Sequence, residues 1–212
     1  MGRGSAGNYV KMVHNGIEYG LMQLISEIYD VAKKGIGYSN EKLAHLFDEW
    51  NRGELQSFLV EITAEIFKKK DDLTGKDLVD MILDKAKQKG TGKWTSQNAM
   101  DLGIPIPTVD AAVTMRAISA LKDQRVDADA VYHTPSLGND KPDAQTLEHA
   151  LQFAYIVTYA QGMSQLAAAS KSTTTASIWR PLPRYGEVAV SLGLPCWKIS
   201  ERHLIKTLTW QI

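Results

Sequence analysis

Apolar residues recur at helical spacing over a long stretch near the start of the sequence, and no other feature constrains the fold as strongly. Between Asn8 and Lys34 they return every three or four positions, and Gly35 and Gly37 follow as residues that commonly end helices. The apolar residues of this stretch are Val10, Val13, Ile17, Leu21, Leu24, Ile25, Ile28 and Val31. The spacing therefore predicts one long helix with a buried face.

Helical spacing continues through much of the remaining sequence. Ser39 has the side chain of a helix N-cap, and an apolar face follows it up to Trp50. Further helices are expected at 55–67, 78–85, 96–102, 109–122 and 144–170, the last of them alanine-rich and buried on most sides. The segment 127–143 lacks periodicity and is expected to be a linker. Because helix follows helix without strands, the sequence predicts an all-α fold up to Ser170.

Charge and cysteine content exclude several classes of protein. The 24 Lys and Arg residues balance 24 Asp and Glu residues, so no net field favours nucleic acid or an acidic membrane as a partner. The single cysteine, Cys196, excludes an internal disulfide framework and a multi-cysteine metal site, and no metal is expected. The sequence has neither an apolar run of about 20 residues nor a signal-peptide core. We therefore expect a cytoplasmic protein without a membrane partner.

Polar side chains of different chemistry share one face of the first predicted helix. Lys11, His14, Asn15 and Glu18 follow the spacing i, i+3, i+4 and i+7, and Tyr19 lies at the edge of the same stripe. An ordinary solvated face with one or two ion pairs would also explain this spacing. However, solvated faces are usually built from Glu and Lys, whereas this stripe combines acid, base and amide groups. The mixture favours a site for a small polar substrate.

A second candidate is a glycine-rich segment that could bind an anion. The residues from Lys89 to Thr95 combine two glycines with two lysines, and the glycines are expected to keep this segment out of a regular helix interior. The spacing is not that of a P-loop, and a tight interhelical turn with exposed lysines would explain it equally well. Arg116, in an otherwise apolar helix, either extends to the surface or pairs with a buried anion. Solvated or structural roles are expected for the remaining histidines considered, which are His45, His133 and His149.

Several segments together resemble one enzyme family. The sequence YVKMVHNGIEYG at 9–20 is similar to the signature helix of 6-phosphogluconate dehydrogenase, the NADP-dependent decarboxylating enzyme of the pentose phosphate pathway and gluconate utilization. The resemblance extends over residues 4–170 through EWNRGEL at 49–55, the segment at 89–95, SALKD at 119–123 and YAQGM at 159–163. Leu21 stands where many members have Asp, just outside the polar stripe. The resemblance implies the helical substrate-binding and dimerisation domain of this family.

The resemblance also implies roles for individual residues. Lys11 would be the general base and Glu18 the general acid in the conversion of 6-phosphogluconate to ribulose 5-phosphate and CO2, with NADP as hydride acceptor. The expected substrate-binding residues are His14, Asn15 and Tyr19 for the sugar acid, and Lys89 and Arg116 for its phosphate. The family implies a homodimer. A related β-hydroxyacid dehydrogenase with another substrate is disfavoured, because Lys89 and Arg116 suit a phosphate.

Two departures from the family affect what the chain is expected to do. No Gly-rich fingerprint followed by βαβ patterning occurs, so the NADP-binding Rossmann domain is expected to be missing and the chain as written to be inactive. From about residue 171 the sequence departs from the family, and a shifted reading frame would restore a family motif. The expected division is therefore a helical domain at 1–170 and a non-family tail at 171–212, in which Trp179, Trp197, Trp210 and Cys196 have no evolved function. A non-catalytic helical module that dimerises or binds phosphorylated sugar acids remains the alternative.

Overall fold

The structure is a computed structural model that describes residues 5–132 and 141–172. Over these residues every regular element is a helix, and the isolated bridge between Lys70 and Asp77 is the nearest approach to a strand. The helices are α1 (Ala6–Asp30), the π-helix η1 (Val31–Ile36), α2 (Asn40–Trp50), α3 (Phe58–Lys68), α4 (Leu78–Met81), α5 (Thr91–Asp101), α6 (Pro107–Ala120), α7 (Lys122–Val131) and α8 (Ala144–Ser172). The predicted all-α fold is confirmed.

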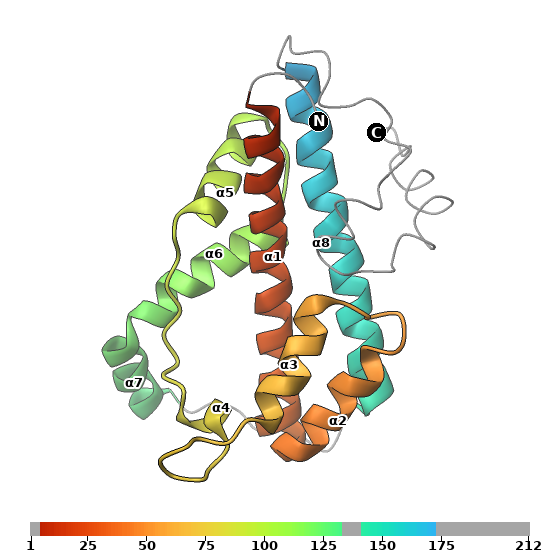
Figure 1. Ribbon diagram of the computed structural model, residues 1–212. Helices are drawn as coiled ribbons and strands as arrows, with labels where there is room; N and C mark the ends of the chain where they lie inside the picture. The colour runs from red at the N-terminus through yellow and green to blue at the C-terminus, as the bar shows by residue number, and fades with distance from the viewer. Residues whose placement is uncertain (1–4, 133–140, 173–212) are drawn as a thin grey trace.

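Helix α1 is the central element of this arrangement. Figure 1 shows α8 running beside it on one side, α5 and α6 on the other, and α2 with α3 across its C-terminal end. Val13, Ile17 and Leu21 of α1 are almost fully buried and pack in one core with Leu151 and Tyr155 of α8. Leu21, where many relatives were expected to have Asp, is therefore a core residue. The polar stripe lies on another part of α1, which leaves it available for a site.

Glycines allow α1 to approach two of its neighbours closely. A Cβ atom added to Gly162 of α8 would lie 2.5 Å from Cδ1 of Ile17, and one added to Gly16 would lie 2.6 Å from Cγ2 of Thr95 in α5. Real Cβ atoms do not make contacts this short, so larger residues at these positions would force the helices apart. The glycines thus fix how near α5 and α8 lie to α1.

The N-cap of the second helix is confirmed, whereas the first helical run passes through Gly35 and ends slightly later than predicted. The helical run that starts in α1 continues through η1 and ends at Gly37, whose φ of 91° is in the left-handed region that glycine adopts without strain. Ser39 then caps α2, since the backbone N–H of Lys42 donates to the Ser39 hydroxyl at 3.2 Å. The apolar face of α2 is buried up to Trp50, as its spacing predicted.

Two helices differ from the predictions between residues 55 and 85. The third helix starts at Phe58 rather than Leu55, because the Ser57 hydroxyl caps it by accepting from the N–H of Val60 at 3.3 Å. Phe58 and Ile66 fit the apolar spacing of the helix predicted at 55–67, but Phe58 is 56% exposed and Ile66 is also exposed. The helix predicted at 78–85 is confined to Leu78–Met81. Apolar spacing in this region therefore overestimated both helix length and burial.

Three further predictions are corrected towards the C-terminal half. Helix α5 begins at Thr91, so most of the segment at 89–95 is helical, and only Gly90, with φ of 96°, makes the turn before it. The expected linker at 127–143 is helical at its start, because α7 extends to Val131. Helix α8 buries one face rather than most sides, and its Phe153 is 70% exposed. Within the described ranges, no helix is both long and apolar enough to cross a membrane.

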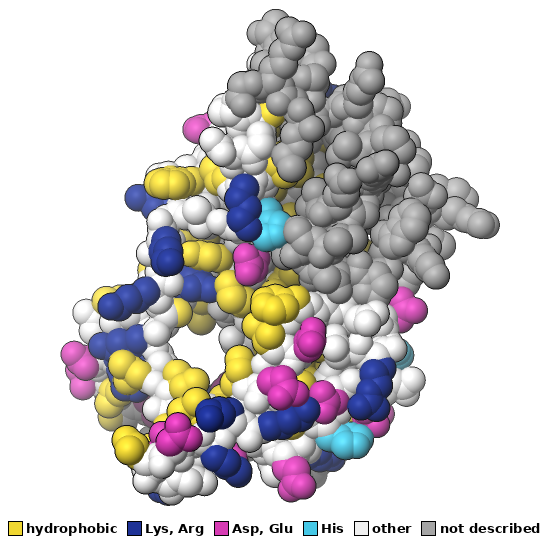
Figure 2. Space-filling model, viewed as in Figure 1, with side chains coloured by type: hydrophobic (Ala, Val, Ile, Leu, Met, Phe, Trp, Pro, Cys, Tyr) yellow, Lys and Arg dark blue, Asp and Glu magenta, His cyan; other side chains and the backbone are white. Residues whose placement is uncertain are grey.

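The segment from 69 to 90 connects α3 to α5 along the outside of the molecule. Figure 1 shows it running past α6 and α7 with only the short α4 as regular structure. In the space-filling view of Figure 2, an opening separates part of this segment from α1. Its path is therefore not set by packing on the central helix along its whole length.

Candidate substrate site on α1

Of the four polar residues predicted to share one face of α1, three surround the imidazole of the fourth, His14. Its Nδ1 atom lies 3.2 Å from Lys11 Nζ and 3.3 Å from Asn15 Oδ1, and 3.9 Å from an oxygen of Glu18. The His14 side chain is mostly buried, whereas Lys11 is exposed and Glu18 is half-buried. The structure thus brings the predicted acid, base and amide groups together on one helix.

His14 is held in its neutral form. Burial lowers its pKa below the ordinary value of 6.5, and the nearby positive charge of Lys11 lowers it further, against smaller opposite effects of Asn15 and Glu18. In the tautomer with hydrogen on Nε2, Nδ1 accepts from Lys11, and in the other tautomer Nδ1 donates to Asn15. His14 can therefore orient Lys11 without adding a second positive charge beside it.

Tyr19 joins this stripe to the predicted anion-binding residues. The Arg116 guanidinium lies over the Tyr19 ring, with Cζ 3.9 Å from the ring centroid, and the backbone N–H of Lys89 donates to the Tyr19 hydroxyl at 3.4 Å. A Cβ on Gly92 would lie 2.5 Å from the Tyr19 ring, so only glycine lets the first turn of α5 pack so close. Tyr19 thus contacts both halves of the predicted phosphate site.

Arg116 does not extend into solvent, which was one of the two alternatives that its sequence context suggested; pairing with an anion stays a prediction. Its guanidinium is half-buried, stacks on Tyr19 and donates from Nη1 to the backbone oxygen of Lys87 at 2.8 Å. It is therefore neither extended into solvent nor paired with a buried side-chain anion. Because this hydrogen bond uses one N–H of the five in the guanidinium, further donors remain for a bound oxyanion.

A hollow beside Lys11 includes residues that were not named individually as site candidates. Thr91 and Trp94 of α5 face the start of α1 across it, and Trp94 is exposed although it is large and apolar. Both belong to the glycine-rich segment at 89–95, which was the sequence signal for this side of the site. The lining residues are Ser5, Asn8, Tyr9, Lys11, Met12, Asn15, Thr91 and Trp94.

Buried hydrogen bonds fix α5 against the site. The Thr95 hydroxyl lies 2.9 Å from the backbone oxygen of Met12, and the buried Gln165 of α8 donates to the Thr95 backbone oxygen at 3.0 Å. Thr95 ends the glycine-rich segment that the sequence indicated, whereas Gln165 was not a candidate, because its contact joins positions far apart in the chain. They hold the three helices around the site in one position.

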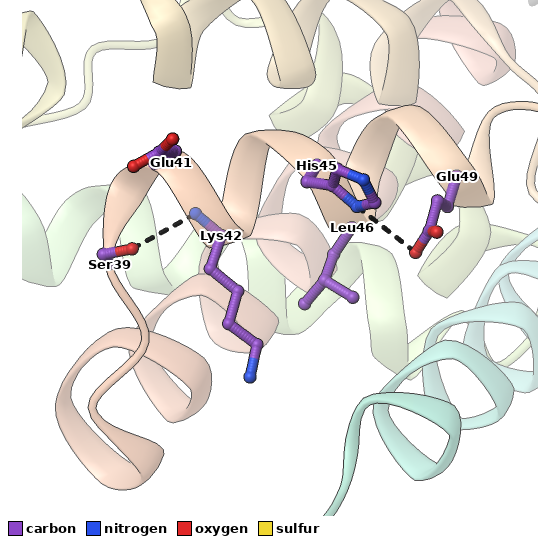
Figure 3. A pocket seen from close by; sticks show the side chains of 6 residues that line it. All are labelled: Ser39, Glu41, Lys42, His45, Leu46 and Glu49. Atoms are coloured by element: carbon purple, nitrogen blue, oxygen red, sulfur yellow. Dashed lines mark hydrogen bonds and ion pairs between the residues drawn. The ribbon is translucent and has the colours of Figure 1, made fainter.

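A second surface hollow lies on the outer face of α2, away from the stripe (Figure 3). His45 points towards Glu49 there, with 3.5 Å between Nδ1 and Oε2, and both side chains are exposed. His149 is exposed as well, so both histidines are solvated as expected. His133, Cys196 and the tail from residue 173 onwards lie outside the described residues. Among the residues that are described, no group of three His, Cys, Asp or Glu side chains could hold a metal ion.

Comparison with known proteins places these features in a family. The model of the family "6-phosphogluconate dehydrogenase, C-terminal domain" matches residues 7–180, which includes every residue of the stripe as well as Lys89 and Arg116. The chain belongs to this family. The predicted family and its all-α C-terminal domain are thereby confirmed. The match extends to residue 180, beyond the division expected at residue 170, which stays a prediction.

Relatives and a solved structure agree with the family match. The NADP(+)-dependent, decarboxylating 6-phosphogluconate dehydrogenase of Bacillus subtilis is 50% identical over 194 residues, which are 90% of this chain and 40% of the relative. The enzyme of Shigella boydii is 52% identical over 92% of this chain and 43% of its own length. The chain thus spans about 40% of the length of these relatives.

The structural match covers a similar share. The 6-phosphogluconate dehydrogenase of Plasmodium falciparum, solved without ligands, with NADP+ and with 6-phosphogluconate, superposes with a TM-score of 0.77 at 49% identity. The superposition covers 81% of this chain and 38% of that protein. The fold of the described residues is therefore that of the family's helical domain.

Proposed function

We propose that this chain forms the substrate-binding and proton-transfer part of an NADP-dependent oxidative decarboxylation of 6-phosphogluconate to ribulose 5-phosphate and CO2. The observation that carries the proposal is the continuous arrangement of two groups of residues, the first on α1 and the second packed against it. Lys11, His14, Asn15 and Glu18 form the first group, and Tyr19 connects them to Lys89 and Arg116. The Bacillus subtilis relative is an NADP(+)-dependent, decarboxylating 6-phosphogluconate dehydrogenase, and the Plasmodium falciparum enzyme binds NADP+ and 6-phosphogluconate.

The first group suits transfer of protons to and from a sugar acid. In the proposed roles Lys11, as the neutral amine, removes the proton from the substrate hydroxyl that becomes a ketone. Glu18, in its protonated form, gives a proton to the carbon of the enediol that remains after CO2 has left. His14 and Asn15 hydrogen-bond the sugar acid and orient Lys11. Each proton step thus has a group of matching chemistry on one helix face.

The second group suits the phosphate. Arg116 offers a planar set of donors whose plane is fixed by the Tyr19 ring, and Lys89 adds a positive charge. No side chain caps the N-terminus of α5, so its first N–H groups remain as additional donors. Together these groups would hold a dianion at one end of the substrate.

The described residues do not suit the coenzyme in the same way. They contain no strand, and hence no strand–turn–helix unit of the kind that holds the phosphates of a dinucleotide. NADP+ would supply the hydride acceptor when bound. The residues of this chain described above account only for the contacts to the sugar acid, the phosphate contacts and the proton transfers.

A homodimer is part of the proposal. Large apolar side chains are exposed on several helices, including Met100 of α5, Val126 of α7 and Phe153 of α8. Surfaces of this kind are commonly covered by another subunit. Sedimentation velocity on the purified chain would show a species of about twice 23.5 kDa, whereas a monomer at all concentrations would contradict the dimer.

The experiment that tests the function needs no hydride transfer. In D2O, removal of a proton from C1 of ribulose 5-phosphate gives the enediol, and its return exchanges C1 hydrogen for deuterium, which NMR detects. We expect exchange above the uncatalysed rate, with Glu18→Gln reducing it by at least about 10-fold and Glu27→Gln, on the same helix, leaving it unchanged. Binding of 6-phosphogluconate is measured in parallel by calorimetry, with gluconate as the ligand that lacks the phosphate.

The outcomes separate the alternatives. Equal affinity for 6-phosphogluconate and gluconate, or no binding of either, would overturn the proposal. Exchange that is unaffected by Glu18→Gln would overturn the role of Glu18. Phosphate-dependent binding without exchange would support a non-catalytic phosphosugar-binding module instead.

A further inference from the structure

The main chain that leads to Lys89 depends on a few hydrogen bonds for its position. Between the end of α4 and the start of α5 it forms no regular helix or strand, and its apolar residues Ile82 and Leu83 are exposed. An opening separates part of the surrounding segment from α1 (Figure 2). On its N-terminal side, therefore, neither core packing nor secondary structure fixes the place of Lys89, whereas α5 begins two residues after it.

Ser119 of α6 binds this main chain at Ala86. The backbone N–H of Ala86 donates to the Ser119 hydroxyl at 2.8 Å. The hydroxyl hydrogen has two acceptors, the backbone oxygen of Ala86 at 3.4 Å and that of Arg116 at 2.8 Å. One side chain thus lies within reach of both backbone groups of a residue 33 positions away in the sequence.

The same turn of α6 also carries Arg116. Its Nη1 donates to the backbone oxygen of Lys87, the residue after Ala86, while its guanidinium stacks on Tyr19. Residues three apart on a helix lie on one face, so Ser119 and Arg116 hold consecutive residues of the extended chain from one side. One turn of α6 therefore carries Arg116 and also holds the main chain that leads to Lys89.

A second anchor lies two residues before Ala86. The Asp84 carboxylate pairs with Lys122, and with Arg125 Nη1 at 2.9 Å; Arg125 Nη2 donates to the backbone oxygens of Asp84 at 3.0 Å and Ser119 at 3.1 Å. These hydrogen bonds hold the pKa of Asp84 well below its usual range. The chain is thus fixed before Ala86 by α7 and after Lys87 by the contact of the Lys89 N–H with Tyr19.

We infer that Ser119 is a positioning residue that places Lys89 for the phosphate of the substrate, with the Asp84 pairing as the second anchor. The inference rests on the proposed function, because it assigns Ser119 a part in binding the phosphorylated end of 6-phosphogluconate. Ser119 does not touch the ligand. It acts by holding Ala86, so that Lys89, three residues further, stays beside Arg116 and Tyr19.

A double-mutant cycle tests whether Ser119 acts through Lys89. The dissociation constant for 6-phosphogluconate is measured by calorimetry with the full chain, its Ser119→Ala and Lys89→Met variants and the combination of both. We expect Ser119→Ala to weaken binding by about 5- to 10-fold, the effect of one lost hydrogen bond. In the Lys89→Met background the same change should weaken it by less than about 2-fold, because the group that Ser119 positions is gone.

Controls distinguish positioning from a general loss of structure. Ser119→Thr keeps the hydroxyl and should restore most of the affinity. Ser26→Ala removes a serine hydroxyl that also bonds within a helix, to the Met22 backbone oxygen at 3.0 Å, and should leave binding unchanged. If Ser119→Ala does not fold, the same cycle is run with Asp84→Asn, for which we expect the same non-additivity.

Failure of the inference differs from failure of the proposed function. If the wild-type chain does not bind 6-phosphogluconate, or Lys89→Met binds it as the wild type does, the proposed phosphate site is wrong. If Lys89→Met weakens binding while Ser119→Ala does not, or Ser119→Ala weakens it equally in both backgrounds, the positioning role is overturned and the phosphate site stands.

Discussion

At the scale of single residues, helical geometry made part of the site predictable. Lys11, His14 and Glu18 lie within eight positions of one another, so the period of an α-helix alone places them on one face. The contact between Arg116 and Tyr19 spans 97 positions and depends on how α6 crosses α1, which spacing does not encode. The sequence therefore indicated the stripe, whereas the stacking of Arg116 emerged only from the packed helices.

The buried, neutral His14 predicts a pH dependence of stability. Its pKa in the folded protein lies below the ordinary value of 6.5, so between these two values the unfolded chain binds more protons than the folded one. The contribution of His14 to the free energy of unfolding should therefore fall as the pH decreases from about 7.5 through 6.5, and level off below the pKa of His14 in the folded state. The stability advantage of the wild type over His14→Gln should shrink over the same range.

Thermal melts followed by circular dichroism at pH 7.5 and pH 5.5 measure this difference. The comparison with His14→Gln removes the contributions of the other histidines, which are common to both proteins. A difference in melting temperature that stays constant with pH would show that His14 does not change its protonation on unfolding.

At the scale of elements, apolar periodicity located the helices better than it located their ends. Leu55 is fully buried, as its place in the apolar pattern suggests, but it lies outside α3. The helix starts after it because the Ser57 hydroxyl caps α3. Conversely, the glycines of the segment at 89–95 predicted a break in helical structure. Gly92 nevertheless lies in the first turn of α5, where the Tyr19 ring packs against it and leaves no room for a side chain. Burial and helix propensity were thus overridden by a cap in one case and by a tertiary contact in the other.

The close contact between α1 and α8 predicts a large effect of a small substitution. Gly162→Ala places a Cβ 2.5 Å from the buried Ile17 side chain, so the two helices must move apart or Ile17 must leave its rotamer. We expect a loss of about 2 kcal/mol in the free energy of unfolding, measured by urea denaturation. This loss should outweigh the better helix propensity of alanine.

Gly53→Ala is the matched control. Gly53 lies in the turn after α2, its nearest neighbour is 3.7 Å away and its φ is outside the left-handed region. Its substitution should change stability by less than about 0.5 kcal/mol. Equal effects of the two substitutions would contradict the view that α1 and α8 are in contact through Gly162.

At the scale of the whole molecule, the chain consists of a packed group of helices and a long excursion at 69–90. The core is shared by α1, α2, α3 and α8, whereas the excursion holds few buried residues and its Leu73 is 94% exposed. Figure 1 shows that this excursion nevertheless leads directly into α5 beside the proposed site. A part of the described chain without buried residues therefore carries one of the residues proposed to bind the phosphate.

Limited proteolysis tests this division. Segments with few buried contacts open most readily, so within the described residues trypsin should first cut between 69 and 90, at lysines such as Lys76. Mass spectrometry of the early fragments identifies the site. Saturating 6-phosphogluconate should slow cleavage after Lys87 and Lys89 more than cleavage after Lys76, whereas first cuts inside α1 or α8 would contradict the proposed division.

The position of the two groups along α1 has a consequence for which substrates fit. Lys11 and Tyr19 are eight residues apart, so the rigid helix separates them by about 12 Å along its axis. This spacing does not adjust to the ligand, because α1 is packed on several sides. We expect α1 to keep this distance constant. A phosphorylated acid with one carbon fewer would then contact either the phosphate-binding residues near Tyr19 or the proposed base Lys11, but not both.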